Sequence, residues 1–92
     1  MIVTYELRSK ALADFLRLAR SHAAHTLKEA PGCLQYDVVL VSEVLVIFYE
    51  QYTSMAAFRN HQASASLAEF RLARAPLVEK DAAIVGSLID IE

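Results

Sequence analysis

Near the middle of the chain, three residues carry side chains that can exchange protons. Glu50 and Tyr52 close a run of apolar residues that begins at Val44, and His61 follows in a stretch with helical spacing. An imidazole titrates near neutral pH, and a neighbouring acid or phenol can orient it or bind a substrate oxygen. These residue types predict an acid–base site in which His61 is catalytic and Tyr52 and Glu50 are its polar neighbours.

The same three residues also have structural interpretations. His61 could be a core histidine that is hydrogen-bonded to a hydroxyl, with no role in chemistry. Glu50 could cap the helix that follows it or pair with an arginine such as Arg59. The residue types alone leave both interpretations open.

Four further side chains are candidates for contact with a substrate. Tyr36 and Tyr49 lie on predicted strands, where tyrosines more often pack and bond locally than bind ligands. Phe58 precedes His61 by one helical turn and shares its face. His22 lies at the edge of the apolar stripe of the first helix, whereas His25 is expected to point toward solvent.

Alternating apolar side chains predict four strands, with a charged turn before the last one. These strands cover residues 2–8, 33–41, 44–52 and 83–91, and the turn covers residues 79–81. The connection at residues 42–43 has only two residues, so the strands that it joins are expected to form an antiparallel hairpin.

Helices are predicted in the two longer connections. Ser9 is expected to cap the first helix, which must end near Ala30 because a proline and a glycine follow. Ser54 is expected to cap the second. Small and polar residues at 63–66 interrupt that helix, which resumes over 67–75.

The resulting order is βαββαβ, for which right-handed crossovers favour a ferredoxin-like α+β sandwich. In this fold a four-stranded antiparallel sheet carries its helices on one face. The strands at 33–41 and 44–52 are apolar on both faces, so the uncovered face is expected to pack against a second copy. We therefore predict a homodimer.

Composition sets limits on the class of protein. The chain has 92 residues, predicted to form a single domain over 1–92, and 55% of them are hydrophobic, more than a small monomer easily buries. A net charge of −2 without a basic run argues against nucleic acid or an anionic membrane as a partner. The single cysteine, Cys33, is typical of a reducing cytoplasm, and neither a signal peptide nor a spanning segment is recognisable.

No pattern indicates a bound metal or cofactor. The three histidines lack metal-ligand spacing, and the two glycines cannot form a nucleotide-binding loop. We expect neither a metal nor a flavin or nicotinamide.

Three motifs together resemble the antibiotic biosynthesis monooxygenase family. They are a glycine and cysteine before the second strand, a glutamate and aromatic residue that close the third, and a serine-capped helix with a histidine. In this chain the matching residues are Gly32 and Cys33, Glu50 and Tyr52, and Ser54 and His61. The resemblance extends over nearly the whole chain.

This resemblance implies a dimeric α+β barrel and, in some members, oxidation of phenolic or polycyclic aromatic compounds by molecular oxygen without metal or flavin. The expected function is therefore a cofactor-independent monooxygenase acting on a small aromatic, phenolic or quinol-like compound. Two alternatives stay open: a non-catalytic dimeric module that binds a small hydrophobic molecule or scaffolds a partner, and an isomerase of the same superfamily.

Overall fold

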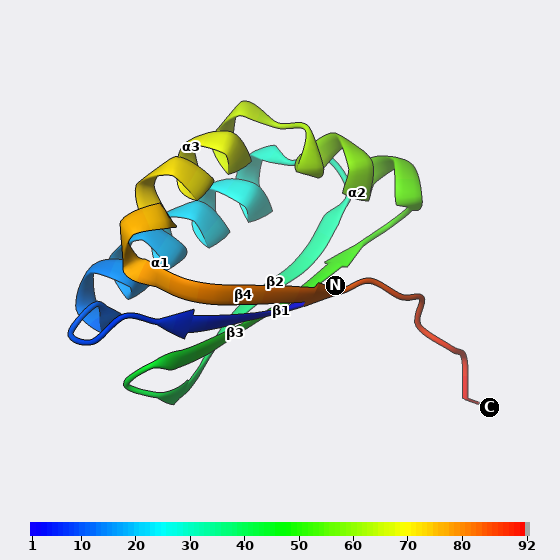
Figure 1. Cartoon of the computed structure of the whole chain (residues 1–92). Coiled ribbons are helices and arrows are strands. Elements are labelled where there is room, and N and C mark those ends of the chain that lie inside the picture. The colour runs from blue at the N-terminus through cyan, green and yellow to red at the C-terminus, as the bar shows by residue number, and fades with distance from the viewer. Residues whose placement is uncertain (92) are drawn as a thin grey trace.

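The computed structural model, which describes residues 1–91, is a four-stranded antiparallel sheet with its helices on one face (Figure 1). The strand order is β2-β3-β1-β4, and the fold is the ferredoxin-like α+β fold that the sequence predicts. In chain order the elements are β1 (Ile2–Leu7), α1 (Leu12–Glu29), β2 (Cys33–Ser42), β3 (Leu45–Tyr52), α2 (Met55–Gln62), α3 (Ala65–Arg74), the 3-10 turn η1 (Ala75–Leu77) and β4 (Val78–Ile84).

The core lies between the helices and the inner face of the sheet. Tyr5 on β1 packs on Phe15 of α1 and on Phe48 of β3, with ring centroids 5.1 and 4.7 Å apart. Phe15 and Phe48 are completely buried. Such tilted and edge-on aromatic contacts add to the stabilisation that burial itself provides.

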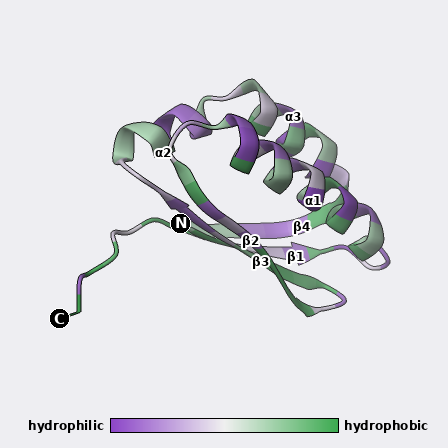
Figure 2. Cartoon of the chain, turned by 180° about the vertical axis from the view of Figure 1, so that it is seen from behind, coloured by the Kyte–Doolittle hydropathy of each residue, from purple (hydrophilic) through white to green (hydrophobic). Residues whose placement is uncertain are grey.

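The opposite face of the sheet carries apolar side chains that no helix covers. In an antiparallel pair, residues directly opposite each other point to the same face. Ile2 is opposite Tyr49, and Val39 is opposite Ile47, so all four share this face. Ile2 and Val39 are 41% and 45% exposed. Figure 2 shows the apolar colouring of β2 and β3 near their hairpin.

The prediction for the last strand is wrong. β4 covers Val78–Ile84 instead of 83–91, and the expected charged turn at 79–81 is part of it. The reason is a hydrogen bond between η1 and the residue after β1: the Arg8 amide donates to the Leu77 carbonyl at 2.9 Å. The chain therefore begins to pair with β1 at the next residue, Val78. As an edge strand β4 buries only Val78 and lacks the apolar alternation of an inner strand. Residues 85–91 continue as an extended segment outside the sheet (Figure 1).

Two helix starts differ from the prediction: α3 begins at Ala65 instead of residue 67, and α1 begins at Leu12 without the expected cap. Ser9 does not cap this helix; Ala11 occupies the cap position, because the chain turns through Lys10 at a φ of 65° before the helix begins. The Ser54 cap is confirmed, since its hydroxyl accepts a hydrogen bond from the Ala57 amide at 3.1 Å. The expected interruption is also present, and Ser64 caps α3 in the same way. Within residues 1–91, the helices are too short or too polar for one of them to cross a membrane.

Candidate active site

The end of β3 and the last turn of α2 hold the predicted acid–base residues. Glu50 and Tyr52 alternate onto the inner face of β3, while His61 is the buried residue of α2. The connection between them is short, and the Thr53 amide donates to the Gly32 carbonyl at 2.8 Å, which fixes it against the start of β2. The strand end and the helix are therefore held side by side.

The three side chains meet in the core. The Tyr52 hydroxyl donates to Glu50 Oε1 at 2.7 Å, and His61 Nε2 lies 3.9 Å from the same oxygen. The latter distance is too long for a hydrogen bond. The Tyr52 and His61 rings are stacked with centroids 5.6 Å apart. Glu50 and His61 are only 2% and 3% exposed, so the predicted group is brought together in a dry environment.

Two other predicted residues form a second layer around His61. The His22 ring lies 5.5 Å from the His61 ring and is stacked on Phe70 at 4.5 Å. The Tyr36 ring stands edge-on to His61 at 6.3 Å. Phe70 was not predicted as part of this group, although its position one turn after the buried Leu67 marks it as an inward residue of α3.

Burial determines the charge of these groups. Desolvation raises the pKa of Glu50, an effect that the hydrogen bond from Tyr52 partly offsets. Burial also raises the pKa of Tyr52, and its hydrogen bond to Glu50 raises it further. For the imidazoles burial acts in the other direction: it lowers the pKa of His61 and lowers that of His22 to about 4. Both histidines are therefore neutral at pH 7, and Tyr52 remains a hydrogen-bond donor.

The two imidazoles have unused hydrogen-bonding capacity. Among residues 1–91, neither His22 Nε2 nor His61 Nε2 has a hydrogen-bond partner, although both atoms are buried. Buried polar atoms are nearly always bonded, to protein or to water, and a catalytic role is one explanation for an exception. Each imidazole can therefore form one further hydrogen bond through Nε2.

A cavity of about 470 Å³ adjoins the end of β3. β1 begins at Ile2 opposite Tyr49, so the last residues of β3 extend past the start of β1 and leave a gap. The segment after β4 forms the far wall of this gap. The lining combines predicted site residues with apolar ones: Tyr49, Glu50, Tyr52, Phe58, Met1, Ile2, Met55 and residues 84–88, among others.

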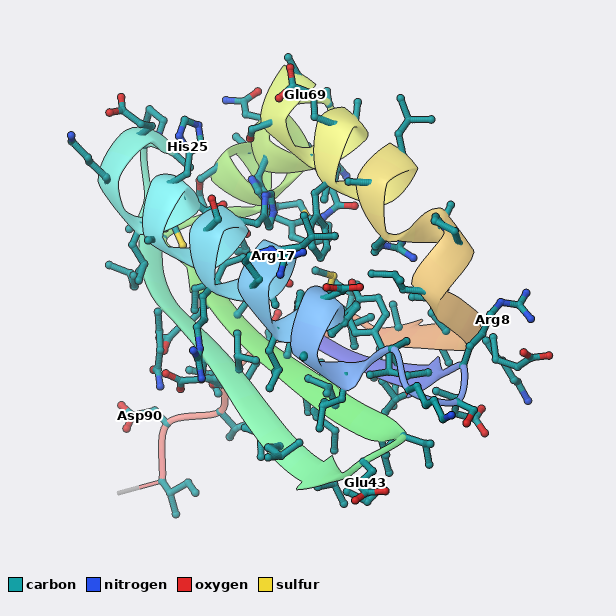
Figure 3. All side chains as sticks on the ribbon, turned by 90° about the vertical axis from the view of Figure 1, so that its left-hand side faces the viewer. Arg8, Arg17, His25, Glu43, Glu69 and Asp90 are labelled. Carbon is teal, nitrogen blue, oxygen red and sulfur yellow. The ribbon has the colours of Figure 1, made fainter. Side chains whose placement is uncertain are left out.

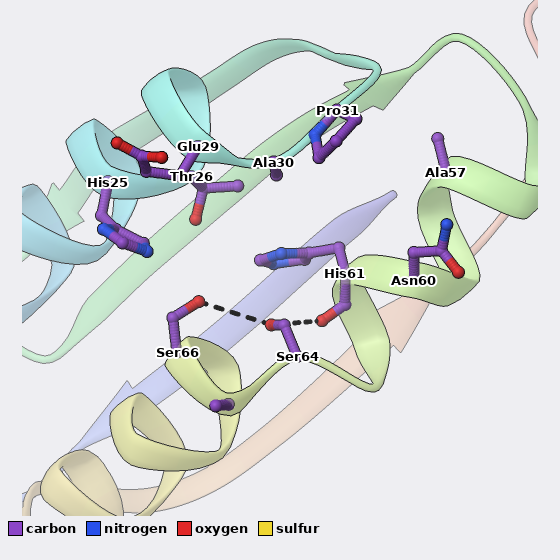
Figure 4. Close-up of a pocket in the computed structure, with 11 residues that line it drawn as sticks. His25, Thr26, Glu29, Ala30, Pro31, Ala57, Asn60, His61, Ser64 and Ser66 are labelled. Atoms are coloured by element: carbon purple, nitrogen blue, oxygen red, sulfur yellow. Dashed lines mark hydrogen bonds between the residues drawn. The ribbon is translucent and has the colours of Figure 1, made fainter.

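A smaller cavity, of about 280 Å³, lies between the end of α1 and the junction of α2 and α3. Figure 4 shows the His61 ring pointing into it, toward Thr26 of α1. His25, expected to point toward solvent, is exposed but also lines this cavity. Figure 3 shows His25 on the outer side of α1, far from the β2–β3 turn that Glu43 marks.

The predicted substrate-binding residues are thus divided between environments. Tyr49 and Phe58 line the larger cavity, while Tyr36 and His22 are buried beside His61. The sequence did not indicate that Met1 and residues 84–88 contribute to the cavity. They reach this gap only because β1 pairs with both β3 and β4.

Within residues 1–91, the acids, histidines and Cys33 do not gather in groups of three or more that could hold a metal ion.

Together, the fold and the buried acid, phenol and imidazole place the chain in the class of small ferredoxin-like α+β proteins with a cavity at the end of the sheet. The chain belongs to the antibiotic biosynthesis monooxygenase family, whose sequence pattern matches residues 1–73.

Solved structures confirm the fold. A protein from Nitrosomonas europaea that carries the family's name superposes with a TM-score of 0.86 at 19% identity, covering 95% of this chain and 86% of that one. A crystal structure described as an antibiotic biosynthesis monooxygenase superposes with a TM-score of 0.83 at 21% identity, covering 97% of this chain and 96% of that one. A protein from Caulobacter crescentus, also named for the family, superposes with a TM-score of 0.80 at 22% identity, covering 92% of this chain and 87% of that one. A comparison with curated proteins gave no match.

Proposed function

We propose that the chain is a cofactor-independent monooxygenase that oxidises a small aromatic, phenolic or quinol-like compound with molecular oxygen. The observation that carries the proposal is the Tyr52–Glu50 pair, joined at 2.7 Å in the wall of the larger cavity. Membership of the family supports the same reaction class.

The larger cavity has the character of a site for an aromatic compound. Its wall is mostly apolar and aromatic, with Phe58 edge-on to Tyr52 at 5.7 Å. Small-molecule sites are typically apolar clefts of several hundred Å³ with a few convergent polar groups. This cavity has that size and that kind of wall. Tyr49 and Phe58 would contact the ring of the substrate, and Tyr52 its hydroxyl.

In the proposed reaction, the substrate hydroxyl gives its proton to the Tyr52 oxygen while the Tyr52 proton moves to Glu50. The resulting anion is electron-rich and transfers electrons to oxygen, which adds to a ring carbon as a peroxide. Loss of water then leaves a carbonyl, so that a phenol and O2 give a quinone and H2O. One oxygen atom enters the product, and the substrate supplies all the electrons. Exclusion of water by the cavity protects the anion.

Oxygen uptake with a panel of phenols and naphthols tests the proposal. The wild-type protein should consume oxygen, and Glu50→Gln should lower turnover by about 10² to 10⁴, the usual effect of losing a general base. Leu72→Ala, at an exposed position of α3, is the control and should behave as wild type. If no compound is oxidised, or if Glu50→Gln retains full activity, the proposal is wrong.

Two outcomes would favour the alternatives. Product formed equally well without oxygen would indicate an isomerase that uses the same proton transfer. Tight binding of aromatic compounds with no turnover in either condition would indicate a non-catalytic binding module.

We also propose that the chain is a homodimer. The uncovered face of the sheet supports this, because Ile2, Val39, Ile47 and Tyr49 share it and helices lie only on the other face. Apolar faces of this kind are commonly covered by a partner.

A further inference from the structure

The acid–base group lies between two cavities. Tyr52 and Glu50 line the larger one, whereas His61 lines the smaller one on the helical side. Among residues 1–91, no single side chain lines both cavities. The connection between them is the buried contact from Tyr52 through Glu50 to His61, with distances of 2.7 and 3.9 Å.

We propose that His61 removes the substrate proton from the site and delivers it to the smaller cavity, which serves as the proton exit. This inference rests on the proposed function, because it starts from the proton that Glu50 receives. It assigns the smaller cavity a role separate from substrate binding.

The first argument is the position of the unpartnered nitrogen. His61 Nε2 is buried, has no hydrogen-bond partner among the described residues, and faces Glu50 Oε1 at 3.9 Å. A small side-chain rotation, or one bridging water, would close this distance. A protonated Glu50 would then donate to His61 Nε2, a buried atom that otherwise lacks a partner.

The second argument is the surroundings of the ring. The titratable and charged groups around His61 are His22 and His25 on α1, Glu29 at its end, Tyr36 on β2, Glu50 and Tyr52 on β3, and Arg71 on α3. Burial, and secondarily the charge of Arg71, lowers the pKa of His61 and disfavours a lasting positive charge on it. An imidazolium formed there would therefore be short-lived, as a relay requires.

Several polar side chains lie in the wall of the smaller cavity. Its wall carries the side chains of His25, Glu29, Asn60, Ser64 and Ser66. The Ser64 hydroxyl donates to the His61 carbonyl at 2.7 Å and lies 3.4 Å from Ser66 (Figure 4). A cavity of about 280 Å³ with such a wall can hold ordered water.

The proton count closes over one cycle. Glu50 passes its proton to Nε2, and the other ring nitrogen releases one to water in the smaller cavity. The imidazole returns to its neutral form with the two nitrogens exchanged, and a ring flip or a second transfer restores the starting tautomer. Each residue returns to its starting protonation state, and a proton from water replaces the exported one when the peroxide is lost as water, so a phenol and O2 still give a quinone and H2O.

Two variants test the relay, with 4-nitrophenol as the bound probe. Phenolate formation is followed by absorbance, and proton release by a pH indicator in stopped flow. His61→Gln should still bind the probe but release the proton roughly 10²-fold more slowly, the lower end of the cost of a lost proton-transfer group. Added imidazole should restore much of the rate by entering the smaller cavity.

Ala65→Phe fills the smaller cavity and leaves the residues of the acid–base group unchanged, and it should slow proton release severalfold. The matched control is Ala68→Phe, because Ala68 is exposed on the same helix and does not line the cavity. This variant should release the proton at the wild-type rate. Wild-type release in both His61→Gln and Ala65→Phe would overturn the relay while leaving the proposed function intact. Failure of the wild type to bind or ionise any phenol would instead remove the proposed function, and the relay with it.

Discussion

Glu50 is a carboxyl group that the fold keeps almost completely out of water, and its properties follow from that. Burial raises its pKa, so the folded protein binds this proton more tightly than the unfolded chain does. Protonated Glu50 therefore contributes its full stabilisation at pH values below its pKa in the unfolded chain. This stabilisation is lost as pH rises through its pKa in the folded protein. A base of raised pKa is better matched to chemistry near neutral pH than an exposed glutamate.

At the same scale, Tyr52→Phe tests whether the hydroxyl contributes to catalysis, to stability or to both. The change removes the hydrogen bond to Glu50, which should cost about 1 to 3 kcal/mol of unfolding free energy because the bond is to an ionisable partner. Turnover of a phenol should fall by at least about tenfold, because the proton path to Glu50 is broken. Chemical denaturation and steady-state kinetics on one sample separate the two effects. An unchanged rate with lowered stability would make Tyr52 a structural residue only.

The burial of His22 should make the unfolding free energy depend on pH in a specific way. Its pKa is lowered from 6.5 to about 4 on folding, chiefly by burial and secondarily by His61. The unfolded chain binds the proton more tightly, so stability is complete above pH 6.5 and is lost as pH falls toward 4. One group with this shift contributes on the order of 3 kcal/mol.

His22→Phe keeps the stacking on Phe70 and removes the titration. Urea unfolding at a series of pH values should give a flatter profile between about pH 6.5 and 4 for the variant. Glu50 is present in both proteins, so its own pH dependence cancels in the difference. Parallel profiles would show that folding does not lower the pKa of His22.

At the scale of elements, the site depends on how closely the β3–α2 connection packs on the start of β2. Gly32 lies at this contact with a φ of 83°, which L side chains rarely adopt. A Cβ at this position would lie 2.5 Å from Thr53 Oγ1 and 2.7 Å from Ala57 Cβ. The glycine is therefore what allows α2 to approach β2.

Gly32→Ala should lower the unfolding free energy by about 2 to 4 kcal/mol, since a left-handed backbone and an overpacked contact add up. It should also reduce turnover, because α2 must shift and carries His61. Gly86→Ala is the control, because the added Cβ would meet nothing within 4 Å. Thermal unfolding of both variants is the measurement, and equal melting temperatures would contradict the packing argument.

At the scale of the molecule, the uncovered apolar face of the sheet determines how the chain behaves in solution. A homodimer through this face should bury well over the roughly 1,000 Å² that a specific interface needs. Ile47 lies on this face on β3, a central strand, paired with Thr4 and Val39. Sedimentation at micromolar concentration should therefore show a dimer.

Ile47→Lys should separate the two copies or unfold the chain, because an unpaired charge buried in an interface costs several kcal/mol. Leu72→Lys makes the same chemical change on the exposed surface of α3 and should leave the dimer unchanged. A wild-type monomer, or a dimer insensitive to Ile47→Lys, would place the interface elsewhere or remove it.

The sequence by itself determined the fold, because apolar periodicity and the Ser54 cap are local signals that survive folding. It also indicated that Glu50, Tyr52 and His61 come together, since alternation on a strand and helical spacing fix which side chains face inward.

Only the tertiary structure decided where the last strand lies, because β4 is an edge strand whose position is set by pairing with β1 and not by its own composition. It likewise decided that the acid–base group separates two cavities. That arrangement depends on the distances between β3, α1 and α2, and on Met1 and residues 84–88 meeting beside Tyr49, none of which a local pattern encodes.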